Sequence, residues 1–230
     1  MNKTVKTLLI AALVIGVPIV IFMFYATGVY DKAVDSDQTV KEKIGNVSSA
    51  YQRRADLFQN LVKVVKAAAK TEKEILVDVV RSRQGMDVVQ QEPAQTNPQM
   101  QQTLDSLGNV IGALKSEAEN LGADANMEKI ATHENNFTKF RSGFNIVIER
   151  YPELKSIKNF QDLQTDITGT ENRINTERNY YNEAVKEHNT LILGFFRQWA
   201  LKFTGGAEKF KEYKPFEHKA GAEDAPDIDI

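Results

Sequence analysis

Residues 37–65 read DQTVKEKIGNVSSAYQRRADLFQNLVKVV, a stretch in which apolar side chains recur mostly at alternating steps of four and three. Such steps place side chains on one side of an α-helix, which completes a turn in about 3.6 residues. We predict one helix from about Asp37 to Arg83, with a core-facing side wide enough for a helical bundle or coiled coil. The apolar positions that define this side are Val40, Ile44, Val47, Tyr51, Phe58, Leu61 and Val65.

Three further helices are predicted downstream, over residues 98–121, 125–150 and 159–204. Asn97 followed by Pro98 is typical of an N-cap and the first helical position. Each range carries its own apolar stripe, and a glycine or a Tyr-Pro step follows each of the first two. The sequence therefore predicts an all-α protein.

Long helices joined by short connections usually pack antiparallel. The expected fold is an N-terminal transmembrane helix plus a long antiparallel up-and-down four-helix bundle. Its fourth helix is predicted to begin after an N-cap at Asn159. Pairing of the two outer helices places Arg54 near Tyr181 and Asp56 near Arg178.

Residues 7–29 read TLLIAALVIGVPIVIFMFYATGV and contain no charged residue. At about 1.5 Å per residue, this stretch is long enough to cross a hydrocarbon core of about 30 Å. A cleaved signal peptide is the alternative, but its apolar region is usually only about 7 to 15 residues long. We therefore predict a retained transmembrane helix.

Composition then divides the chain into four parts. Residues 1–6 form a short N-terminal tail, 7–29 the transmembrane helix, and 30–204 the helical bundle domain. Residues 205–230 form a C-terminal tail that is first aromatic and basic and then of a composition typical of disorder.

The charges that flank residues 7–29 bear on membrane orientation. Lys3, Lys6 and the α-amino group precede the apolar stretch, whereas Asp31, Lys32, Asp35 and Asp37 follow it. Because cytoplasmic flanks carry an excess of positive charge, we expect the N-terminus inside and the body outside.

The sequence favours neither catalysis nor nucleic-acid binding. With 29 basic and 31 acidic residues, the net charge of -2 provides no basic field for phosphate backbones. The chain has no cysteine, none of the common nucleotide-binding, hydrolase or zinc-protease motifs, and three scattered histidines. We therefore expect no enzyme activity, no cofactor and no metal site. His188 interrupts the apolar side of the fourth predicted helix, where we expect a hydrogen-bonded structural histidine.

Charged and amide side chains also interrupt the apolar sides of the first and fourth predicted helices. An unpaired charge in a bundle core costs several kcal/mol, so these groups should pair or reach solvent. One interpretation is a buried polar layer that fixes helix register; the other is a groove for a partner or ligand. The candidates are Arg54, Asp56, Glu72, Glu171, Asn172 and Arg178.

A second group of candidates lies near the C-terminus, where aromatic and basic residues alternate. Rings combined with cations suit the headgroup layer of a membrane. Alternatively, the rings close the end of the bundle. The membrane-surface candidates are Phe195, Phe196, Arg197, Trp199, Lys202 and Phe203.

Three separated motifs carry a resemblance to a known family. They are YQRRADLFQNLV at 51–62, YPELK at 151–155, and GTENRI at 169–174 followed by YNEAV at 181–185 and Asn189. In this order they resemble the LemA family of bacterial membrane-anchored proteins. The resemblance implies a single-span protein with a four-helix body, and it implies no agreed molecular activity.

These observations together predict a non-catalytic scaffold or adaptor of the bacterial envelope, held in the inner membrane with its body on the outer side. Its helices would present their faces to partner membrane proteins or to copies of itself. The alternative is a ligand-binding or envelope-sensing module that uses the polar layer. An enzyme that lacks the common motifs ranks third.

Overall fold

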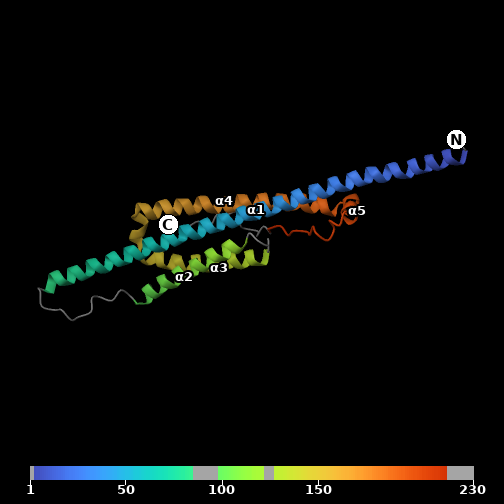
Figure 1. Ribbon diagram of the computed structural model, residues 1–230. Coiled ribbons are helices and arrows are strands. Elements are labelled where there is room, and N and C mark those ends of the chain that lie inside the picture. The colour runs from blue at the N-terminus through green and yellow to red at the C-terminus, as the bar shows by residue number, and fades with distance from the viewer. Residues whose placement is uncertain (1–2, 85–97, 122–126, 217–230) are drawn as a thin grey trace. The chain divides into compact units, whose positions relative to one another are not determined.

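The computed structural model describes residues 3–84, 98–121 and 127–216. Across these ranges the regular elements are all helices and there is no strand, which confirms the predicted all-α class. The elements are α1 (Lys3–Gln84), α2 (Pro98–Leu121), α3 (Met127–Arg150), the short 3-10 helix η1 (Pro152–Ser156), α4 (Lys158–Leu193) and α5 (Phe195–Phe203) (Figure 1).

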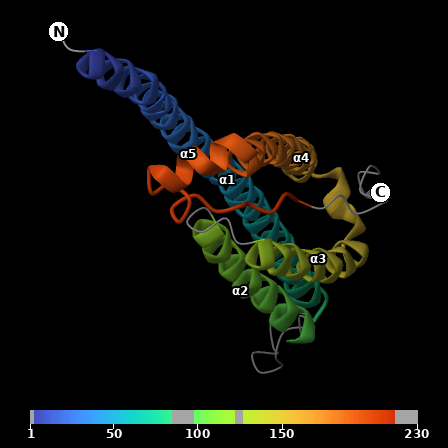
Figure 2. The same cartoon turned by 90° about the vertical axis from the view of Figure 1, so that its right-hand side faces the viewer.

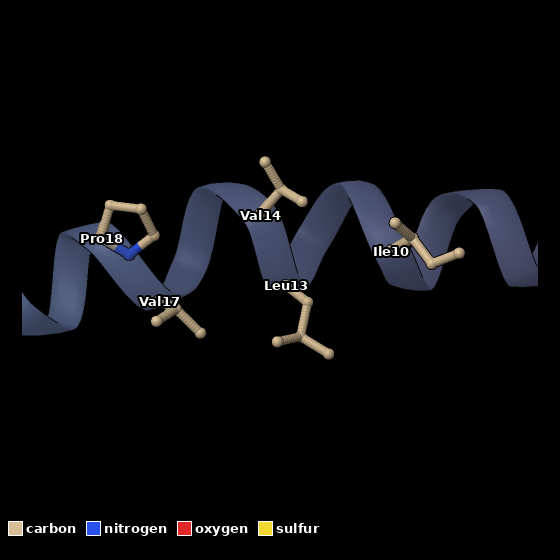
Figure 3. Close-up of a pocket in the computed structure, with 5 residues that line it drawn as sticks. All are labelled: Ile10, Leu13, Val14, Val17 and Pro18. Carbon is tan, nitrogen blue, oxygen red and sulfur yellow. The ribbon is translucent and has the colours of Figure 1, made fainter.

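Helix α1 joins the predicted transmembrane stretch to the predicted first bundle helix without interruption over 82 residues. Pro18 is accommodated inside the helix. Among the described residues, α1 alone is long and apolar enough to cross a membrane, and none of the most apolar 18-residue window is buried against the protein. Figure 3 shows five of these side chains, Ile10, Leu13, Val14, Val17 and Pro18, projecting from the ribbon around an open apolar depression.

The boundaries of the later helices differ from the prediction at two places. Helix α4 begins at Lys158, so the predicted N-cap at Asn159 is wrong. The carbonyl of Ile157, just after η1, accepts bonds from the backbone N–H groups of Phe160 and Gln161 and so starts the helix. The predicted fourth helix is also split, because Gly194 has extended backbone angles (φ -63°, ψ 130°) between α4 and α5.

The chain forms two compact units, and both α1 and α4 contribute to each of them. Unit 1 comprises the described residues of 1–44 and 178–217, and unit 2 those of 45–177. The boundary falls within helices rather than in a loop.

Unit 2 is built around one hydrophobic core to which α1, α2, α3, η1 and α4 all contribute. Helices α2 and α3 lie side by side in this unit (Figure 1). The ring of Phe58 from α1 meets three rings of α3 edge-on, those of Phe137, Phe140 and Phe144, at centroid distances of 5.1 to 6.0 Å. Aromatic packing therefore anchors α1 to α3.

Unit 1 has a smaller core that joins the end of the apolar stretch of α1 to α4, α5 and the segment after α5. Its members are Ala26, Val29, Ala33, Ile192, Ala200, Leu201 and Phe210. Small alanines on α1 let the neighbouring helices approach closely.

Two glycines turn the chain from α5 into the following segment, and they confirm the predicted end of the helical part. Gly205 has a φ of +74°, which side chains other than glycine rarely adopt. At Gly206 a Cβ atom would lie 2.9 Å from Leu201 and 3.1 Å from Tyr30, so only glycine fits without a shift. The turn brings Phe210 into the core of unit 1.

Candidate functional site

Arg54 is the most deeply buried charged residue of unit 2, with 2% of its surface exposed. Its guanidinium donates to Glu134 of α3 at 2.8 Å and to Glu171 of α4 at 3.3 and 3.4 Å. It also lies over the ring of Phe137, 3.6 Å from the centroid, and 4.9 Å from that of Tyr51. Arg54 is thus held between two half-exposed carboxylates and two aromatic faces, an arrangement suited to the flat guanidinium.

His133 of α3 lies beside this arginine and is 1% exposed. Its ring is 5.0 Å from that of Tyr51, and its Nδ1 is 3.4 Å from Glu117 Oε2. Neither ring nitrogen has a hydrogen-bond partner among the described residues, and the contact with Glu117 becomes an ion pair only when His133 is protonated. Burial, followed by the charge of Arg54, lowers the pKa of His133 below its ordinary value of 6.5.

Of the predicted polar-layer residues whose side chains the structure describes, it brings Arg54 and Glu171 together. Asp56 accepts a bond from Lys115 of α2 at 2.7 Å instead of lying near Arg178. Arg54 is level with Glu171, ten positions before the predicted Tyr181. The predicted register of the outer helices is therefore wrong.

The remaining described candidates, Asn172 and Arg178, have different surroundings. Asn172 is exposed. Arg178 belongs to unit 1, where its guanidinium lies 5.2 Å from the centroid of Phe216. The side chain of Glu72 lies outside the described residues.

Unit 1 contains a second polar cluster, which we call the tail clamp: Asn182, His188 and Asn189 of α4 with residues 211–216. The side-chain amide of Asn189 donates to Tyr213 O at 2.8 Å, and its carbonyl accepts from Tyr213 N at 3.1 Å. Asn182 makes the same pair of bonds with Phe216, at 3.2 and 2.7 Å.

The spacing of the two asparagines explains why the clamp holds an extended chain. Seven residues of helix rise about 10.5 Å, and three residues of extended chain cover about 10 Å. Asn182 and Asn189 are therefore as far apart along α4 as Tyr213 and Phe216 are along an extended segment. Each asparagine satisfies one backbone N–H and one C=O, as a neighbouring strand would.

His188 completes the clamp, and its burial with hydrogen bonds confirms the structural role predicted for it. Its Nε2 lies 3.2 Å from Lys211 O, and its Nδ1 lies 2.9 Å from Ser36 Oγ on α1. Burial lowers the pKa of His188, while the Lys211 carbonyl and Asp37 partly oppose this effect. At neutral pH the ring is therefore uncharged.

Two tyrosines tie the same segment to the helices. Tyr213 donates to Asp37 Oδ1 at 2.8 Å, and Tyr181 donates to Lys214 O at 3.2 Å. Burial raises the pKa of Tyr181 to about 12 and that of Tyr213 further, so both remain protonated donors. Burial opposes ionisation of Asp37, but bonds from Lys41 and Tyr213 bring its pKa below the ordinary value.

The predicted membrane-surface residues all belong to α5, and their side chains are exposed. The side of α5 that faces the protein carries Ala200 and Leu201 instead. Arg197 donates to Thr190 O at 3.4 Å, within the same unit. The exposed rings of α5 therefore do not close a bundle end.

Sequence reasoning missed Glu134, His133 and the tail clamp. Glu134 and His133 follow one another at positions facing the core and its edge, and the helical pattern of α3 could have indicated them. No pattern could have indicated the clamp, because its bonds join side chains to backbone groups of a non-helical segment.

In chemical terms, both clusters make structural contacts. The described residues contain no group of three or more side chains that could hold a metal ion. Within unit 2, the guanidinium of Arg54 is bound to its two carboxylates, and within unit 1 the clamp side chains are bound to backbone groups. The nitrogens of His133 and Nε of Arg54 are the buried side-chain atoms of the described ranges without a hydrogen-bond partner.

Comparison with known proteins shows to which family this chain belongs. Two relatives from Paramagnetospirillum magneticum, magnetosome proteins MamQ 1 and MamQ 2, are each 26% identical over 200 residues, covering 86% of this chain and 68% of the relative. The LemA family profile matches residues 43–230, which include all three motifs, the Arg54 cluster and the tail clamp. The chain therefore belongs to the LemA family.

Proposed function

We propose that this protein is a non-catalytic, membrane-anchored scaffold or adaptor of the bacterial envelope. The observation that carries the proposal is α1, in which an outward-facing apolar stretch continues as the central helix of a folded helical body. One continuous helix would thus belong to both the anchor and the body. The names of the two relatives refer to a cellular structure, the magnetosome, and neither name states a reaction.

The architecture proposed for the body is an antiparallel four-helix bundle. Three contacts between α1 and α2 support it, because they join Ser48 to Ala118, Asp56 to Lys115 and Lys66 to Asp105. Along these pairs the residue number increases on α1 and decreases on α2, as it does between antiparallel helices. Contacts of Glu117 with His133 and of Leu107 with the Gly143 position favour the same relation between α2 and α3.

The proposed location is the bacterial inner membrane, crossed once by residues 7–29, with the body on the periplasmic side. The basic residues before the span and the acidic residues after it favour this orientation. Because the chain has no cysteine, a single introduced cysteine is the only site that a thiol reagent can label, and its accessibility shows on which side of the membrane it lies. In intact cells, a membrane-impermeant maleimide should label Ser49→Cys and should label Thr4→Cys only after lysis. The opposite labelling would reverse the orientation.

The proposed partners are the lipid bilayer and other membrane or envelope proteins, with self-association as one form of that contact. In-cell crosslinking tests this role. A photo-crosslinking amino acid at the exposed positions Asn60 and Lys63 of α1 should trap the same protein or proteins reproducibly. The buried position Val65 serves as the matched control and should trap only this chain. A lack of protein adducts at every exposed position would count against the scaffold.

A ligand-binding or envelope-sensing module is the second candidate, and His133 is the observation that favours it. Two unpartnered ring nitrogens lie beside the buried Arg54, where a protonation or ligand change would be felt by three helices. Native mass spectrometry of the purified full chain tests this role. A small molecule that is retained by the wild type and lost in His133→Phe would favour the sensor over the scaffold.

A further inference from the structure

The exposed rings of α5 lie beside the end of the predicted membrane span. Ala200 and Leu201 of α5 share a core with Ala26 and Val29 of α1. Phe203 meets Phe22 edge-on, with ring centroids 5.5 Å apart. Because the span is predicted to end at Val29, these contacts place α5 at its last two turns.

Helix α5 also runs in a direction that differs from that of α4. After the break at Gly194 the chain turns, and α5 crosses α1 instead of continuing along it (Figures 1 and 2). A helix that crosses a spanning helix at its end is placed where it can lie along the plane of the membrane surface. Interfacial amphipathic helices lie in this plane.

The outward side of α5 is aromatic. At about 100° per residue, positions 195, 196, 199 and 203 fall within an arc of about 100°. Exposed fractions are 70% for Phe195, 74% for Phe196, 64% for Trp199 and 60% for Phe203. Phe203 belongs to this aromatic side and contacts Phe22 of the span, so the apolar surface of the span continues onto α5.

Polar groups border this aromatic surface at the positions that an interface requires. Lys202 and Gln198 lie on the polar side of α5 and are exposed. Lys209 donates to the hydroxyl of Tyr30 at 2.8 Å, one residue beyond the predicted span. Cations and a tyrosine hydroxyl suit the headgroup layer, where basic residues also meet anionic lipids.

We propose that α5 is a second membrane element, which lies in the bilayer interface with Phe195, Phe196, Trp199 and Phe203 among the acyl chains. The occupant of this surface is lipid, because the surface is continuous with a stretch that itself requires lipid. The inference rests on the proposed membrane anchoring. Its consequence is that the protein holds the membrane at two places in one compact unit, which fixes the tilt of α1.

Trp199 provides the test, because it is the only tryptophan in the chain. The full chain is reconstituted into vesicles of phosphatidylcholine and phosphatidylglycerol that carry a nitroxide either near the headgroup or near the methyl end of the acyl chain. Trp199 should be quenched strongly by the shallow nitroxide, weakly by the deep one, and several-fold less by aqueous iodide than an exposed tryptophan.

Two relocated tryptophans calibrate the result. In Trp199→Phe/Tyr180→Trp, the probe lies on the exposed side of α4 and should be quenched by iodide alone. In Trp199→Phe/Leu13→Trp, the probe lies inside the predicted span, six residues after Thr7, and should be quenched by the nitroxides. If Leu13→Trp escapes both nitroxides, the anchoring itself fails. If Leu13→Trp is quenched but Trp199 is not, the anchoring stands and the placement of α5 in the bilayer interface is refuted.

A substitution pair provides the second measurement. Phe195→Glu/Phe196→Glu should remove most of the nitroxide quenching of Trp199 without changing the helical content, since both rings are exposed. Lys186→Glu, at an exposed position of α4, should leave the quenching unchanged. Trp199 shielded from iodide and from both nitroxides would mean that a second protein copy covers α5, and it would overturn the proposal.

Discussion

The two units satisfy their buried polar groups in different ways. In unit 2 a charged side chain, Arg54, is paired with other side chains, the half-exposed Glu134 and Glu171. In unit 1, Asn182, His188 and Asn189 are uncharged and pair mainly with backbone atoms of residues 211–216. The first arrangement links helices to one another, whereas the second holds an extended segment on a helix.

This difference determines how much each cluster should contribute to stability. Removing Arg54 takes the cation from two carboxylates that are only partly solvated and leaves a buried space between the helices, so the cost is large. Removing an asparagine from the clamp strands a backbone N–H and a C=O that water can still reach at the surface. The expected effects therefore decrease from unit 2 to unit 1.

Arg54→Ala should have the largest effect. It leaves Glu134 and Glu171 without their cation and opens a space against Phe137, and we expect a loss of about 3 to 5 kcal/mol. Hydrogen exchange of the α3 amides in the full chain, in lipid nanodiscs, measures this change. Lys63→Ala, at an exposed position, should shift the same amides by no more than about 0.5 kcal/mol. Equal effects of the two substitutions would contradict the burial of Arg54.

Asn189→Ala should have a smaller effect that is confined to unit 1. The loss of two hydrogen bonds to Tyr213 should cost about 1 to 3 kcal/mol. Exchange of the Tyr213 amide should accelerate, and trypsin should cut sooner after Lys211, while the α3 amides of unit 2 stay protected. Asn172→Ala is the matched control, because that side chain is exposed. Faster exchange of the α3 amides in Asn189→Ala would show that the tail clamp also stabilises unit 2.

The two buried histidines should make stability depend on pH, with a smaller total effect. Burial lowers both pKa values below 6.5, so the unfolded chain takes up protons first as the pH falls. The free energy of unfolding should reach its full value above about pH 6.5 and should decrease as the pH falls below this value.

Replacement of each histidine sharpens this comparison. Protonation of His133 is opposed by burial and by the charge of Arg54, which Glu117 and Glu134 offset only in part, whereas a protonated His188 can donate to both Ser36 and Lys211. His133→Gln should therefore flatten the pH dependence more than His188→Gln. Melting curves of the full chain in nanodiscs, recorded from pH 7 to pH 5, provide the measurement, and the reverse order would contradict this account.

Tyr213→Phe should have the smallest effect. It removes the single bond to Asp37 and keeps the ring beside His188, so the loss should be about 0.5 to 1.5 kcal/mol. Because Tyr213 helps to lower the pKa of Asp37, that pKa should also rise in the variant. Carboxylate titration by NMR of the labelled chain detects this change. An unchanged Asp37 would show that the bond is not formed.

The sequence anticipated the elements better than their partners. The stripe through Val40, Ile44 and Tyr51 and the terminators at Pro152 and Gly205 follow from local rules of helix periodicity and capping, which need no knowledge of the fold. The break at Gly194 was not predicted, because a single glycine is tolerated inside many helices. Its effect depends on Ala200 and Leu201 finding a core on α1.

By itself, the sequence determined the all-helical class, the apolar stretch at 7–29, the family and the place of Arg54 on the apolar side of its helix, since each depends on spacing along one helix or on local motifs. Only the tertiary structure decided that Arg54 meets Glu134 and Glu171, that Asn182 and Asn189 hold residues 211–216, and that α5 crosses α1 beside the span. The physical reason is register. A slide of one helix along another preserves every local pattern but changes every pair, and only the packing of particular side chains fixes it.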